Sequence, residues 1–95
     1  MNVRIDEEKV KQIADYYGWN SQLKQLAEEC SELSVEALHY IREGRGIERI
    51  SEEIVDVLIM IQQIIYLLRN DVEKLEKYAE FKIDRQLRRI EKEQE

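Results

Sequence analysis

The sequence predicts an all-α protein, and three of its features support this class. The 95 residues contain no proline and only three glycines, so little in the chain interrupts helices. Apolar residues recur at spacings of three and four along most of the chain, which is the period of one helix face. Charged residues make up 38% of the chain and fill the positions between them. We expect one compact domain, residues 1–95, of four helices around a central helical hairpin.

The first two helices are predicted from the residues at their ends. Asp6 is a good N-cap followed by two glutamates, and Gly18 should end the first helix after Tyr17. Asn20 or Ser21 is expected to cap the second helix. The expected core stripe of this second helix comprises Leu23, Leu26, Ala27, Cys30, Leu33, Ala37, Leu38 and Ile41.

The third helix is the most apolar segment of the chain. It should begin between Ile47 and Ser51, after the turn at residues 44–46. Both of its sides are largely apolar, and a single layer of helices in so short a chain cannot cover them both. We therefore expect a homo-oligomer, either a dimer or a tetramer, that assembles into a larger helical bundle. The expected subunit interface is the second apolar arc of this helix, Val55, Ile59, Tyr66 and Leu67. The expected main face comprises Ile50, Ile54, Val57, Leu58, Ile61, Ile64, Ile65 and Leu68.

The fourth helix combines an apolar stripe with a basic flank. It is expected to start at Asn70, with Glu73 placed as in a capping box. The flank contains Lys82 and Arg85, which stand apart from the apolar positions. The stripe that this helix should bury comprises Val72, Leu75, Ala79, Ile83, Leu87 and Ile90.

Two pairs of carboxylates interrupt the apolar central segments. Glu53 and Asp56 are three residues apart near the start of the third helix, and Glu29 and Glu32 repeat this spacing in the second. Residues three apart are neighbours on one helical face. An ionised carboxylate costs several kcal/mol to bury without a partner, and buried carboxylates are normally paired or bound to a metal.

A hairpin that turns at Arg45 would bring the two pairs together. Glu32 lies thirteen residues before Arg45 and Asp56 lies eleven after it. At a rise of about 1.5 Å per residue, the two acids differ in height by less than one helical turn. Oxygen-only ligands favour Mg²⁺, or Mn²⁺, over zinc or copper. The predicted metal ligands are Glu29, Glu32, Glu53 and Asp56.

The pattern Glu29-x-x-Glu32 followed by Glu53-x-x-Asp56 resembles the motif of the MazG-like, all-α nucleoside triphosphate pyrophosphohydrolases, in which these acids hold magnesium. The surrounding residues are similar as well. They are Gly18-Trp19-x-x-Gln22-Leu23, the turn Gly44-Arg45-Gly46, and the fourth-helix residues Lys82 and Arg85. The resemblance covers residues 18–90.

This resemblance implies an enzyme that hydrolyses a nucleoside or deoxynucleoside triphosphate to the monophosphate and pyrophosphate, and so cleans nucleotide pools. Lys82 and Arg85 are expected near the triphosphate, because the family uses basic groups of this helix there. Gln22 and Gln25, and Trp19 by stacking on a base, are candidates to contact the nucleoside. The predicted catalytic residues are the four acids Glu29, Glu32, Glu53 and Asp56.

The composition excludes several other classes. A net charge of −6 argues against non-specific nucleic-acid binding. The apolar run is too short and too interrupted for a membrane span, and the N-terminus is charged from Arg4 onward, unlike a signal peptide. Cys30 is the only cysteine, so it cannot form an internal disulfide and suits a reducing compartment. We expect a soluble cytoplasmic protein.

Two other functions remain open. One is a non-catalytic helical oligomer, a scaffold or regulatory partner with an acidic groove. The other is a divalent-metal-binding helical bundle that uses the same carboxylates without the basic flank. A di-iron site is not expected, because such a bundle needs two Glu-x-x-His motifs and His39 is the only histidine.

Overall fold

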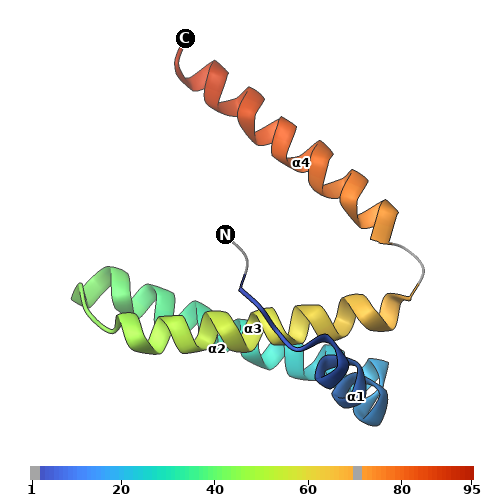
Figure 1. Ribbon diagram of the computed structural model, residues 1–95. Helices are drawn as coiled ribbons and strands as arrows, with labels where there is room; N and C mark the ends of the chain where they lie inside the picture. The colour runs from blue at the N-terminus through green and yellow to red at the C-terminus, as the bar shows by residue number, and fades with distance from the viewer. Residues whose placement is uncertain (1–2, 70–71) are drawn as a thin grey trace.

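Four helices make up almost all of the chain that the computed structural model describes, residues 3–69 and 72–95 (Figure 1). They are α1 (Glu7–Tyr17), α2 (Trp19–Glu43), α3 (Ile47–Leu68) and α4 (Val72–Glu93). These two ranges contain no strand. The all-α, four-helix prediction is therefore confirmed. Within the same ranges, no helix is both long enough and apolar enough to cross a membrane.

Local residues fix the ends of α1. The Asp6 side chain accepts a hydrogen bond from the backbone N–H of Lys9, at 3.1 Å, so Asp6 is the predicted N-cap. At the other end, Gly18 has φ of 82°, and its N–H donates to the carbonyl of Ala14 at 2.9 Å. This backbone conformation favours glycine because it has no Cβ.

The start of α2 differs from the prediction. The helix begins at Trp19, with Gly18 as the N-cap, and not at the expected caps Asn20 or Ser21. Gly18 reverses the chain so sharply that one residue both ends α1 and starts α2. No capping side chain is present at this junction, so the polar-cap rule misplaced the boundary.

Helices α2 and α3 form the central antiparallel hairpin, as predicted (Figure 1). Gly44, with φ of 69°, ends α2, and its N–H donates to the Tyr40 carbonyl at 2.8 Å. Gly46, with φ of 100°, then leads directly into Ile47. The two glycines make the turn tight, so residues equally distant from it lie side by side on the two helices.

The most buried residues of α2 and α3 do not belong to the predicted apolar stripes. The buried residues are Val10, Ala14, Gln22, Met60 and Gln63. The prediction that the apolar stripe of α2 forms the core is wrong for the single chain, because most of that stripe is exposed. Its exposed members are Leu23, Ala27, Cys30, Leu38 and Ile41.

The hairpin has one covered side and one uncovered side. Gln22 and Met60 are buried between the helices, and the exposed Leu23 and Ile61 each follow one residue later. One residue is a rotation of about 100°, and in antiparallel helices equal rotations from the contact line lead to the same side. We call this side the open face. Its exposed apolar residues are Leu23, Leu38, Ile41, Ile47, Ile54, Ile61 and Leu68.

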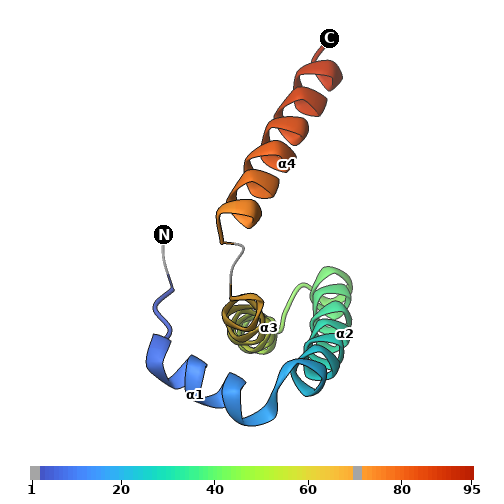
Figure 2. The same cartoon turned by 90° about the vertical axis from the view of Figure 1, so that its right-hand side faces the viewer.

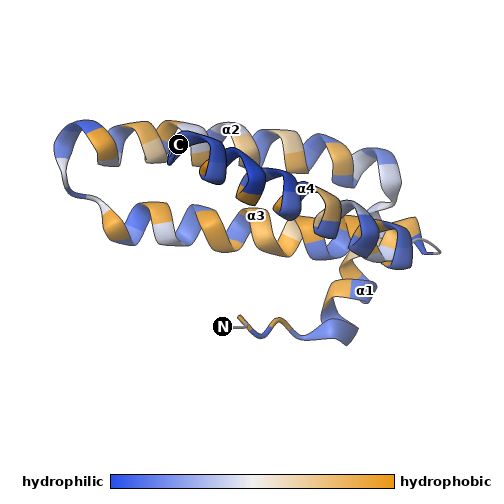
Figure 3. Cartoon of the chain, turned by 90° about the horizontal axis from the view of Figure 1, so that it is seen from above, coloured by the Kyte–Doolittle hydropathy of each residue, from blue (hydrophilic) through white to orange (hydrophobic). Residues whose placement is uncertain are grey.

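Helix α1 covers the other side of the hairpin. Figure 2, which looks along α3, shows α1 below the hairpin and α4 leaving on the opposite side. Seen from the side of α4, apolar positions recur along both α2 and α3 (Figure 3). The apolar stripe of α4 is exposed too, apart from the half-buried Leu75, so the prediction that α4 buries it is wrong for this chain. The expected start at Asn70 lies outside the described residues.

The chain is extended, and the prediction that it is compact is wrong. Its accessible surface is 8155 Å², whereas a folded monomer of 11.5 kDa exposes about 5,800 Å². Its radius of gyration is 16.2 Å, compared with about 12 Å for a globular chain of this length. The excess surface comes from the open face and from α4, neither of which the rest of the chain covers.

Candidate metal centre

Three of the four predicted ligands converge between the two helices of the hairpin. Glu29 of α2 and Glu53 and Asp56 of α3 each offer one carboxylate oxygen, and these atoms lie within 4.8 Å of one another. The tight turn sets the two helices level, and the three-residue spacing puts Glu53 and Asp56 on one face. The hairpin thus brings Glu29 to two acids that lie 24 and 27 positions later in the sequence.

Glu32 lies at the exposed rim of this cluster. Its pKa is raised above the ordinary value, mainly by the negative charge of Glu29, and further by partial desolvation and by Asp56. Burial raises the pKa of Glu53, and the charges of Glu32, Asp56 and Glu29 raise it further. The four acids therefore act on one another electrostatically, although only three present oxygens to a common point.

Two carboxylate oxygens of the cluster are buried without a donor. They are Oε2 of Glu29 and Oε2 of Glu53, neither of which has a hydrogen-bond partner among the described residues. The other oxygen of Glu29 accepts a hydrogen bond from Nε2 of Gln25 at 2.9 Å. Leaving a buried acceptor unpaired costs stability. A set of carboxylate oxygens with unpaired acceptors fits a hard divalent cation such as Mg²⁺.

No basic side chain of the described residues neutralises the cluster. Arg49, the basic residue on the same stripe of α3, pairs instead with Glu36 at 3.2 Å. The ion pairs within residues 3–69 and 72–95 include none of the four acids. Glu36, which is level with Glu53 in the hairpin, is thus occupied by an arginine, whereas the neighbouring acids have no cation partner.

The cluster opens to solvent on the side of α1. Ser21 lines a hollow between α1 and the hairpin. Glu32 follows Ser21 by eleven residues, which is three helical turns. Both residues therefore face the same side, opposite to the open face. A shallow recess at this place gives access to two of the acids. Its lining residues are Ser31, Glu32, Val35, Glu36, Arg49 and Glu53.

The predicted substrate-binding residues are not all brought to the cluster. Gln25 contacts it directly, through Glu29. Gln22 is buried one helical turn away, and Trp19 is partly exposed at the start of α2. Lys82 and Arg85 lie on α4, which extends away from the hairpin (Figure 1), so the chain does not place its own basic flank beside its own acids.

Gln63 is a residue of this region to which the sequence analysis gave no role. Its side chain is 2% exposed and, like Gln22, lines the hollow between α1 and the hairpin. A signal for it exists in the sequence, because Gln63 follows Asp56 by seven residues and continues the polar stripe of α3.

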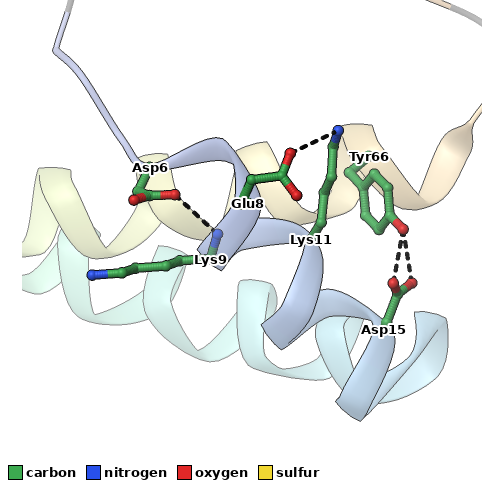
Figure 4. Close-up of polar contacts among 6 residues, drawn as sticks. All are labelled: Asp6, Glu8, Lys9, Lys11, Asp15 and Tyr66. Carbon is green, nitrogen blue, oxygen red and sulfur yellow. Dashed lines mark hydrogen bonds and ion pairs between the residues drawn. The ribbon is translucent and has the colours of Figure 1, made fainter.

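A second polar cluster fastens α1 to α3. The Tyr66 hydroxyl donates to the carboxylate of Asp15, with distances of 2.8 and 3.0 Å to its two oxygens (Figure 4). Arg69 approaches the same carboxylate at 3.4 Å, and the Lys11 ammonium lies 5.9 Å from the Tyr66 ring centre. The hydrogen bond to Asp15, together with partial burial, raises the pKa of Tyr66. This arrangement accounts for the position of α1 beneath the hairpin.

Comparison of the chain with protein-family models, curated proteins and solved structures gave no match.

Proposed function

We propose that the protein is a Mg²⁺-dependent hydrolase of the MazG-like type, which converts a nucleoside or deoxynucleoside triphosphate to the monophosphate and pyrophosphate in the cytoplasmic nucleotide pool. The observation that carries this proposal is the convergence of Glu29, Glu53 and Asp56 between two helices, with two buried oxygens that lack donors. The motif resemblance supplies the reaction class.

The four acids have two roles in this proposal. Glu29, Glu53 and Asp56 hold the cation, and Gln25 orients Glu29 through its hydrogen bond. A bound Mg²⁺ neutralises phosphate charge and lowers the pKa of an attacking water. Glu32 is exposed at the rim beside these ligands, and in this proposal its carboxylate is the general base that accepts the proton of that water. Mn²⁺ fits the same oxygen donors.

We further propose that the open face pairs with the open face of a second copy. The expected interface arc is not the exposed one, because Ile59, Tyr66 and Leu67 are half-buried within the chain and only Val55 is exposed. Along α3, apolar residues follow the alternating three and four spacing of a coiled-coil seam, with isoleucine at most positions. Isoleucine at both seam positions favours bundles of more than two helices, and two hairpins supply four. The seam comprises Ile47, Ile50, Ile54, Val57, Ile61, Ile64 and Leu68.

The surface area supports the same assembly. Each chain exposes about 2,350 Å² more than a compact monomer of its mass. Two copies would hide about 4,700 Å² by covering this excess, which lies in the range of obligate homodimers. A dimer satisfies this requirement, and a tetramer would arise by pairing two dimers.

A second copy on the open face would lie beside α4. Helix layers pack 8–10 Å apart, so the outer side of that copy, where its acids open, lies about 15 Å from the first hairpin. Lys82 and Arg85 follow Val72 by ten and thirteen residues, or about 15 and 20 Å along α4. We propose that the α4 of one copy brings these two basic groups to the acids of the other, where they offset charge on the leaving pyrophosphate.

The test of the function is incubation with a panel of nucleoside triphosphates and Mg²⁺, with chromatography of the products. We expect monophosphate and pyrophosphate, and diphosphate would contradict the cleavage position. Glu29→Gln should lower kcat/KM by about a hundredfold or more. Glu28→Gln is the matched control, because Glu28 is an exposed neighbour that does not join the cluster. Equal activity of the two variants would refute the site.

The same samples separate the two rival functions. Mg²⁺ that binds only the folded state stabilises it by about 2.7 kcal/mol at a hundredfold excess over Kd, and so raises Tm. A rise in Tm without hydrolysis would favour the metal-binding bundle. Neither a rise in Tm nor hydrolysis would favour the non-catalytic oligomer.

A further inference from the structure

A recess lined by basic side chains lies at the turn end of the hairpin. Its lining residues are Val35, Glu36, His39 and Arg42 of α2 and Arg49 of α3. Glu36, His39 and Arg42 are three residues apart and so share one face of α2, and the tight turn brings Arg49 to the same place. We call this hollow, of about 270 Å³, the turn recess.

The turn recess carries an excess of positive charge in a chain whose net charge is −6. Its lining contains two arginines and one glutamate. Glu36 pairs with Arg49 at 3.2 Å, whereas Arg42 has no ion-pair partner among the described residues. The Arg49 side chain is 74% exposed although it is paired, so its guanidinium can also reach a bound ligand. Two guanidinium groups and the imidazole of His39 offer N–H donors that suit the oxygens of a tetrahedral oxyanion.

The turn recess adjoins the shallow recess of the candidate metal centre. Both are lined by Val35, Glu36 and Arg49, and the recess of the metal centre is also lined by Glu32 and Glu53. The Glu36 side chain is only 14% exposed. Burial is the main cause of the raised pKa of Glu53, and the charge of Glu36 contributes to it as well. The ion pair between Glu36 and Arg49 therefore lies between the two recesses and influences the charge at the metal centre.

We propose that the turn recess binds a tetrahedral oxyanion, the chemistry of orthophosphate and of the pyrophosphate product, and that this binding strengthens cation binding at the metal centre. The oxyanion takes Arg49 from Glu36. The Glu36 carboxylate then presents an uncompensated negative charge beside Glu53, which attracts the cation. Thermodynamic linkage makes the effect reciprocal, so a bound cation strengthens oxyanion binding by the same factor.

The inference rests on the proposed function for the metal centre, but oxyanion binding itself requires neither metal nor turnover. The first test is calorimetric titration of the full chain with sulfate, a tetrahedral dianion that the protein cannot hydrolyse, in metal-free buffer. We expect a Kd in the millimolar range. Arg42→Met should weaken sulfate binding about tenfold, because it removes a charged donor. Absence of sulfate binding to the wild type would overturn the inference.

Lys24→Met is the matched control for Arg42→Met. Lys24 is an exposed cation of the same helix that lines neither recess, so its replacement removes the same charge at a distance. The Kd of sulfate should therefore stay unchanged in this variant. Equal effects of the two changes on this Kd would overturn the assignment of the oxyanion to the turn recess.

Orthophosphate and pyrophosphate, titrated in the same metal-free buffer, distinguish the two sources of the oxyanion. A lower Kd for pyrophosphate assigns the turn recess to the product of the proposed reaction. Any other order of the two Kd values assigns it to free phosphate.

The second test is titration with Mg²⁺ in the presence and absence of saturating sulfate, at constant ionic strength. Sulfate should lower the Kd of Mg²⁺ about fivefold or more. Glu36→Gln keeps the basic side chains of the turn recess but removes the charge that Arg49 releases. Sulfate should therefore still bind this variant, while the Kd of Mg²⁺ no longer responds to it.

Two results of this second test would overturn the inference. One is a Kd of Mg²⁺ that does not respond to sulfate in the wild type. The other is a response of the same size in Glu36→Gln, which would mean that the two ions attract each other directly and that the ion pair has no part. Arg49→Met is the second variant if Glu36→Gln does not fold, and it should remove the response as well.

The outcomes separate this inference from the proposed function. If triphosphates are hydrolysed but sulfate neither binds nor changes the Kd of Mg²⁺, the hydrolase proposal stands and the inference fails. If sulfate binds through Arg42 and tightens Mg²⁺ binding but no triphosphate is hydrolysed, the inference stands and the hydrolase proposal fails.

Discussion

Mixing two inactive variants should restore activity if each active site is shared between two copies. Glu53→Gln disables the acidic cluster and leaves α4 intact, whereas Lys82→Ala does the reverse. After subunit exchange in an equal mixture, one in four pairings of an acidic cluster with a partner helix carries neither change. We therefore expect about a quarter of wild-type activity from the mixture. If Lys82 served the cluster of its own chain, every site would contain a defect and no activity would return.

The structure indicates that both variants remain folded, which the experiment requires. Lys82 lies on the exposed α4, away from its apolar stripe. Glu53 is half-buried, and burial together with four other carboxylates raises its pKa, so the neutral amide removes an unfavourable charge at pH 7. Neither change creates a cavity or an unpaired buried charge, which are the usual causes of large destabilisation.

The assay is the rate of pyrophosphate release after the two variants have been incubated together. The control mixture combines Glu53→Gln with Glu29→Gln. Both changes lie in the acidic cluster, so every cluster in this mixture is defective and no recovery is expected. The shared site is refuted if the first mixture is no more active than its two components measured separately.

Three further predictions concern assembly, pH and the attachment of α1. If the apolar stripe of α4 packs against the second copy, Ile83→Glu should lower the mass measured by light scattering. Phe81→Glu should preserve the mass, because Phe81 lies on the opposite face of α4 and is about as exposed, at 60% against 59% for Ile83. Equal effects of the two changes would contradict this packing. The pKa of Glu53 is raised above its usual value of 4.5 in the folded protein, so the folded state holds a proton that the unfolded chain has lost between these two values. The free energy of unfolding in EDTA should therefore fall as pH rises through the raised pKa, and Mg²⁺ should reverse this trend. Melting temperatures that do not change with pH across this range would contradict the crowding of the acids. Tyr66→Phe removes the hydrogen bonds to Asp15 and should lower Tm by a few degrees. An unchanged Tm would mean that this contact does not hold α1 against α3.

The positions of the helices could be predicted from the sequence because they depend on local chemistry. Asp6 caps α1 through a residue only three positions away, and Gly18 and Gly44 adopt conformations that other residues rarely adopt. The meeting of Glu29 with Glu53 and Asp56 was also predictable. It requires only a tight turn near Arg45 and the constant rise of a helix.

The sequence alone did not determine which helix face would be covered, and this is where the predictions were wrong. An amphipathic pattern shows that a stripe such as that of α4 needs a partner, but not whether the partner lies in the same chain. In the tertiary structure the polar Gln22 and Gln63 are buried, whereas the apolar Ile61 and Ile83 are exposed. The physical reason is that a 95-residue chain of extended shape buries too little surface to cover every apolar stripe.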